Sequence, residues 1–137
     1  MARKLIIHTD GGARGNPGPA GCGAVLVWEG EKEPAAEISY YMGVATNNQA
    51  EYTAIVLAIE KAKELGASEI DFYLDSELAV KQLNREYKVK NKELEKLFVS
   101  VYNKSQQFKK VTFTHVRREF NKEADVLANQ AMDRKDN

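Results

Sequence analysis

The stretch LIIHTDGGARGNPGPAG, residues 5–21, joins an apolar run, an acid and a turn-rich segment. Its apolar run predicts a short buried strand from Lys4 to Thr9. Asp10 follows directly, at the carboxyl end of a strand expected to be central, where ligands of open α/β sheets gather. The glycines, prolines and asparagine of 11–21 predict a turn-forming loop. Asp10 is therefore either a site residue or a turn residue that binds backbone amides.

The periodicity of the remaining chain predicts further elements on both sides of this stretch. The order of strands and helices favours an α/β fold, with a mixed sheet flanked by helices and its later strands parallel. The predicted elements are strands Cys22–Trp28 and Glu37–Gly43, helix Asn47–Leu65, strand Ile70–Leu74, helices Ser76–Asn84 and Asn91–Ser105, strand Val111–Val116, and helix Asn121–Met132 with Asn121 as its N-cap.

Composition indicates a single domain over residues 1–137. Hydrophobic residues make up 43% of the chain, and 20 basic residues balance 20 acidic ones. Zero net charge means that any basic surface for a nucleic acid has to be local. The single cysteine, Cys22, excludes an internal disulfide and suggests a small packed residue. The absence of a long apolar stretch predicts a cytoplasmic protein that does not bind membranes.

Three more acids lie where solubility alone would not require them. Glu51 begins the apolar stripe of its predicted helix, and Asp125 shares a helix side with Ala128 and Met132. Asp75 directly follows a predicted strand. Each has a local alternative: a first-turn acid favoured by the helix dipole for Glu51 and Asp125, and a helix N-cap for Asp75.

Carboxylates that face a core are costly unless they are paired or bind a metal. Four of them therefore suggest a site for hard divalent cations, Mg²⁺ or Mn²⁺, which prefer oxygen ligands. Zinc is disfavoured because one cysteine accompanies only His8 and His115, which lack ligand spacing. Neither a Walker loop nor a dinucleotide fingerprint is present.

Four motifs, in order, resemble ribonuclease H, type 1, over nearly the whole chain. They are TDGGARGNPGPAG from Thr9, TNNQAEY from Thr46, DSELAVKQL from Asp75 and NKEADVLAN from Asn121. The resemblance implies a mixed five-stranded sheet, made of an antiparallel three-strand meander and two parallel strands. It also implies an endonuclease, expected to be monomeric, that cuts the RNA strand of RNA/DNA hybrids and leaves 5′-phosphate and 3′-hydroxyl ends.

Residue by residue, the resemblance assigns roles to ten positions. It implies that two Mg²⁺ ions, or Mn²⁺, bind the catalytic carboxylates of Asp10, Glu51, Asp75 and Asp125, with Asp10 between both ions. It implies substrate contacts at Gly11, Gly12, Asn16, Thr46, Asn47 and Asn48. Helix capping is the alternative role of the asparagine pair.

The chain departs from the family pattern in two places. Many bacterial relatives carry a histidine before the last acid, but residues 116–122 contain none. Arg118 or Glu119 is a hypothetical substitute, and His115 is expected to be a hydrogen-bonded structural residue. The chain also lacks a basic helix after the third acid, so its nearest basic cluster is either a phosphate contact or a solvated face: Lys81, Arg85, Lys88, Lys90 and Lys92.

Two other functions fit parts of this pattern. A hybrid- or RNA-binding module without turnover would keep the fold, but it would gain nothing from four acids near a phosphate. A nuclease that acts on DNA, as integrases and resolvases do, would keep the chemistry. The asparagine pair and the Gly-Gly loop favour hybrid recognition.

Overall fold

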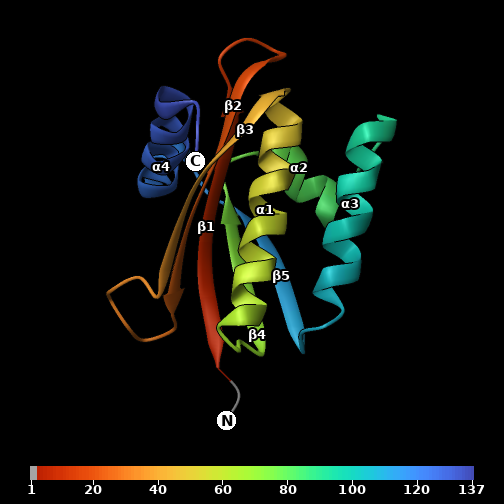
Figure 1. Ribbon diagram of the computed structural model, residues 1–137. Helices are drawn as coiled ribbons and strands as arrows, with labels where there is room; N and C mark the ends of the chain where they lie inside the picture. The colour runs from red at the N-terminus through yellow and green to blue at the C-terminus, as the bar shows by residue number, and fades with distance from the viewer. Residues whose placement is uncertain (1–2) are drawn as a thin grey trace.

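The computed structural model describes residues 3–137, and its elements follow the predicted order (Figure 1). Within residues 3–137, a short 3-10 turn, Arg118–Phe120, is the one element that periodicity did not predict. The strands are β1 (Lys4–Ala13), β2 (Gly18–Trp28), β3 (Ala36–Ala45), β4 (Glu69–Leu74) and β5 (Lys110–His115). The helices are α1 (Asn47–Glu64), α2 (Glu77–Leu83), α3 (Lys92–Ser105) and α4 (Lys122–Arg134).

The strands form one mixed sheet in the order β3-β2-β1-β4-β5. Strands β1, β2 and β3 are antiparallel, whereas β4 runs parallel to both β1 and β5. The predicted combination of a three-strand meander and two parallel strands is therefore confirmed. Because β1 is central and β4 lies beside it, the carboxyl ends of two parallel strands meet at one end of the sheet.

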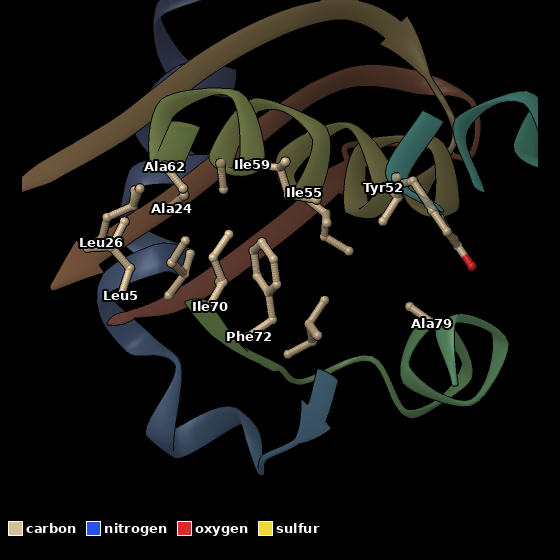
Figure 2. Packing of buried hydrophobic residues seen from close by; sticks show 14 of the residues in the cluster. Leu5, Ala24, Leu26, Tyr52, Ile55, Ile59, Ala62, Ile70, Phe72 and Ala79 are labelled. Atoms are coloured by element: carbon tan, nitrogen blue, oxygen red, sulfur yellow. The ribbon is translucent and has the colours of Figure 1, made fainter. Parts of the chain in front are cut away.

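The main core lies between the sheet and helices α1, α2 and α3. Figure 2 shows Tyr52, Ile55 and Ile59 of α1 above Phe72 and Ile70 of β4. These side chains are almost completely buried. Alternate residues of each strand face this core, which leaves the intervening residues for the opposite face of the sheet.

Helix α4 covers part of that opposite face, and glycines in β2 let it lie close (Figure 1). A Cβ at Gly23 would overlap the carbonyl oxygen of Ala124, and one at Gly21 would meet the carbonyl oxygen of Ala128. The predicted loop over 11–21 is wrong: β1 extends to Ala13 and β2 begins at Gly18. Several of these glycines serve close helix–strand packing rather than a turn.

Asn121 holds the N-cap position of α4, as predicted, but its side chain makes no capping hydrogen bond. Its Nδ2 instead donates to the backbone carbonyl of Thr9 in β1, at 2.7 Å. Cys22 is a free, buried residue, as expected. Within residues 3–137, no helix is both long enough and apolar enough to cross a membrane.

Candidate functional site: an acidic cleft at the end of the sheet

Two of the predicted acids emerge side by side because the β1–β4 ladder stops just before them. Its last pair is Thr9 with Leu74, so Asp10 and Asp75 follow at the same end of neighbouring parallel strands. Strand β1 then continues against β2 alone. The separation of β1 from β4 opens the space that the acids face.

Glu51 reaches this point because α1 lies directly on β1. A Cβ at Gly11 would overlap the backbone of Ala50 and the amide nitrogen of Glu51. Glycine therefore permits the contact that brings the first turns of α1 beside Asp10. Like Asp10, Glu51 is buried, with 9% of its surface exposed.

The structure brings three of the four acids into one cluster. Carboxylate oxygens of Asp10, Glu51 and Asp75 all lie within 4.8 Å of one another. Asp125 is outside this trio but lines the same cleft, whose volume is about 520 Å³. Its carboxylate accepts a hydrogen bond from Asn129 Nδ2 at 3.3 Å. The other lining residues are Gly11, Gly12, Ala13, Arg14, Asn47, Ser76, Arg118, Ala128, Asn129 and Met132.

Crowding of buried acids perturbs their ionisation. Burial, reinforced by the carboxylates of Asp75 and Asp125, raises the pKa of Asp10 from 3.8 to about 8. Burial and then the charges of Asp10 and Asp75 raise the pKa of Glu51 well above its usual value. Burial also raises the pKa of Asp75, although the nearby guanidinium of Arg118 opposes this effect. Ionisation of all three clustered acids is therefore unfavourable in the folded protein, and a bound cation would offset the repulsion between their carboxylates.

The local alternatives for Asp75 and for the asparagine pair are wrong. Ser76, not Asp75, caps α2: its side chain accepts from the amide of Ala79. Thr46 caps α1 through a capping box with Gln49. Asp75 is therefore free of a capping role, and Asn47 and Asn48 are the first residues of α1 itself.

The β1–β2 turn is tied to the start of α1 through asparagines. The amide of Ala13 donates to Asn47 Oδ1 at 2.8 Å, and the amide of Asn47 donates to Asn16 Oδ1 at 3.0 Å. Of the six predicted substrate residues, Gly11, Gly12 and Asn47 line the cleft. Asn16, Thr46 and Asn48 do not line it: Asn16 is bonded to Asn47, Thr46 and Asn48 adjoin Asn47 in the chain, and Asn16 and Asn48 are exposed.

The two hypothetical auxiliary residues differ in position. Arg118 lines the acidic cleft, whereas Glu119 forms an ion pair with Arg117 at 3.1 Å and lies outside it. The expectation for His115 is wrong. This side chain is exposed, and no hydrogen bond of its imidazole is found with any residue from 3 to 137.

Sequence reasoning missed three polar residues at the site. Arg14 lines the cleft, and its guanidinium pairs with Asp133 of α4 at 2.6 Å. Asn129 holds Asp125, and Asn121 binds the peptide before Asp10. The second asparagine was seen only as a helix cap. The contacts of Arg14 and Asn121 join residues that are remote in the chain, so local periodicity carries no signal for them, whereas the Asn129–Asp125 contact lies within α4.

The donor set fits divalent cations. All three clustered residues offer carboxylate oxygens, the preferred ligands of Mg²⁺ and Mn²⁺. Glu51 Oε2 is buried and finds no hydrogen-bond partner in the described part of the chain. A buried, unpartnered carboxylate oxygen beside two other acids is explained most simply by a cation that binds there. Fold and cleft together define an α/β protein with a carboxylate site suited to hard divalent ions.

Comparison with known proteins agrees with this class. The family model described as Reverse transcriptase-like matches residues 8–131. The bifunctional protein Rv2228c of Mycobacterium tuberculosis is 44% identical over 95% of this chain, which spans only 36% of that protein's length. Ribonuclease H of Chlorobium phaeobacteroides is 34% identical over 96% of this chain and 97% of its own.

A solved structure is also similar. The crystal structure of LC11-RNase H1 in complex with an RNA/DNA hybrid has a TM-score of 0.89 and 40% identity, covering 95% of this chain and 97% of that one. Together with the sequence matches, this shows that the chain belongs to the ribonuclease H family.

Proposed function

We propose that this protein is an endonuclease that hydrolyses the RNA strand of RNA/DNA hybrids and leaves 5′-phosphate and 3′-hydroxyl ends. The observation that carries the proposal is the trio of carboxylates within 4.8 Å of one another, where the β1–β4 ladder ends. The family relationship and the LC11-RNase H1 complex with a hybrid support the choice of substrate.

Asp10, Glu51 and Asp75 would hold divalent ions, with Asp125 completing the ligand set from α4. When bound, two such ions, Mg²⁺ or Mn²⁺, would activate a water and neutralise charge on the leaving oxygen. In the net reaction a water oxygen bonds to phosphorus, the bond from phosphorus to O3′ breaks, and O3′ gains a proton. The carboxylates' own contribution is to hold the ion ligands in one place before substrate arrives.

The rim of the cleft would recognise the hybrid. Because Gly12 has no side chain where it lines the cleft, the backbone of Gly11 and Gly12 could approach a minor groove that displays 2′-hydroxyl groups. Asn47 lines the cleft at the start of α1, with Thr46 and Asn48 beside it in the chain and Asn16 bonded to its backbone amide. Arg14 and Arg118 contribute positive charge to the acidic cleft and would contact phosphates.

Arg118 is the proposed substitute for the missing histidine. It lines the cleft and its guanidinium opposes the rise in the pKa of Asp75, whereas Glu119 does not line the cleft. We expect Arg118→Ala to lower kcat by about tenfold or more, within the range for a residue that assists proton transfer or charge stabilisation. Glu119→Ala serves as the matched control. Equal kinetics in both variants would eliminate the role of Arg118.

The function is tested by cleavage of end-labelled RNA in a hybrid, beside single-stranded RNA, duplex RNA and duplex DNA. Each substrate is incubated with Mg²⁺, with Mn²⁺ and with chelator, and the hybrid is repeated with Asp10→Asn. We expect metal-dependent cutting of the hybrid's RNA strand that is lost in the variant. Binding of the hybrid without cutting under either metal would replace the proposal with a binding module, and cutting of duplex DNA would change its substrate.

A further inference from the structure

The segment between β5 and α4 contacts the peptide group that precedes Asp75 and the one that precedes Asp10. The amide of Val116 donates to the carbonyl of Leu74 at 2.8 Å, immediately before Asp75. The side-chain Nδ2 of Asn121 donates to the carbonyl of Thr9 at 2.7 Å, immediately before Asp10. A backbone group makes the first contact, so many residues could stand at 116. The second contact requires a side chain that carries a hydrogen-bond donor.

Asn121 supplies a hydrogen bond that no strand can provide. The β1–β4 ladder ends at the pair of Thr9 and Leu74, so the edge of β1 loses its parallel neighbour there. Thr9 is fully buried and Asn121 is 1% exposed, which keeps water from serving as an easy replacement. The Asn121 amide thus takes the place of the missing strand where the site opens.

The same residue also contacts the helix that carries the fourth acid. The backbone amide of Asp125 donates to the carbonyl of Asn121 at 3.1 Å. Through its side chain and its backbone, Asn121 therefore links the Thr9–Asp10 peptide to the first turn of α4. The side-chain bond joins residues 112 positions apart in the chain, and together with the backbone bond within the first turn of α4 it relates Asp125 to the carboxylate cluster that it does not itself enter.

We propose that Asn121 is a positioning residue that holds Asp10 and Asp125 in register for binding divalent cations. This inference rests on the proposed function, because it assigns those two acids to the metal site. Outer residues that orient metal ligands commonly change metal affinity by about 10- to 100-fold when they are replaced. A residue that served only to stabilise the fold would leave the affinity of the folded protein unchanged.

The experiment measures Mn²⁺ affinity by isothermal titration calorimetry at pH 8, without substrate. Wild type is compared with Asn121→Ala, which removes the donor, and with Asn121→Ser, which keeps a shorter one. Val101→Ala is the control, because Val101 is equally buried but lies in α3 within the main core. Thermal unfolding of each metal-free protein identifies the temperature at which all are folded.

We expect Asn121→Ala to raise the Kd for Mn²⁺ by about tenfold or more, with Asn121→Ser between it and wild type. Val101→Ala should lose stability and keep the wild-type Kd. A folded Asn121→Ala with wild-type affinity overturns the proposal, as does an equal loss of affinity in Val101→Ala. If Asn121→Ala does not fold, wild-type affinity in Asn121→Ser overturns it, and failure of both to fold assigns Asn121 to stability alone. Absence of Mn²⁺ binding in wild type would instead refute the metal site of the proposed function and, with it, this inference.

Discussion

Replacement of Asp10 by asparagine is expected to stabilise the metal-free protein at pH 8. Folding buries Asp10, with 8% of its surface left exposed, beside the other acids of the cleft. In the unfolded chain its carboxyl ionises near its ordinary pKa of 3.8, whereas in the folded protein that pKa rises to about 8. The folded state therefore binds more protons than the unfolded state between these values, and stability falls as pH rises through this window.

The size of the effect follows from the same pKa values. At about 1.4 kcal/mol for each pH unit, a rise from 3.8 to about 8 sets a ceiling of roughly 6 kcal/mol at pH 8. Asparagine recovers only part of this, because its buried amide group brings two donors that need partners. We expect a gain of roughly 2 kcal/mol, or about 8 °C in Tm for a domain of this size.

The assay is thermal unfolding in chelator at pH 8 and at pH 4. The stabilisation should be present at pH 8 and small at pH 4, because pH 4 lies at the lower end of the window between the ordinary pKa of 3.8 and the raised pKa of about 8. Mg²⁺ should raise the Tm of wild type more than that of the variant, because the ion binds the folded site. Glu33→Gln is the control for net charge, since Glu33 is exposed in the β2–β3 connection. A variant that is no more stable than wild type at pH 8 in chelator would refute the reasoning.

Three further experiments test the packing of α4, one buried hydrogen bond, and the coupling of protons to ion binding. Gly23→Ala should lower the free energy of unfolding by about 3 kcal/mol, because the new Cβ would overlap the Ala124 carbonyl and displace α4. Urea unfolding measures this loss, and a near-neutral effect would mean that α4 can shift freely. Tyr52→Phe should lower the free energy of unfolding by about 1–2 kcal/mol, because Tyr52 Oη donates to the buried Gln82 Oε1 at 2.7 Å. An unchanged urea midpoint would show that this hydrogen bond does not stabilise the fold. Mg²⁺ binding should release protons at pH 7 and fewer at pH 9, because the raised pKa of Asp10 leaves its carboxyl largely protonated at the lower pH. Calorimetry in buffers of different ionisation enthalpy measures the number of protons released. If no protons are released at pH 7, ion binding is not coupled to the ionisation of Asp10.

Local sequence determined the order of elements and the candidate acids. A strand or helix leaves a period of two or of 3.6 residues in the sequence, and the two strand-end acids follow their apolar runs directly. Those signals were sufficient to predict the mixed sheet and to select Asp10, Glu51, Asp75 and Asp125. They depend only on near neighbours, so they are readable without the fold.

Only the tertiary structure decided which residues lie next to those acids. Glycines at 11 and 21 read as turn formers in the sequence, yet both lie, like Gly23, in strands where helix backbones approach closely. Asn121 reads as a helix cap, yet its side chain binds the carbonyl of Thr9. The reason is physical: a buried donor or a missing Cβ is selected by a partner that is remote in the chain, and such a partner leaves no periodic trace in the local sequence.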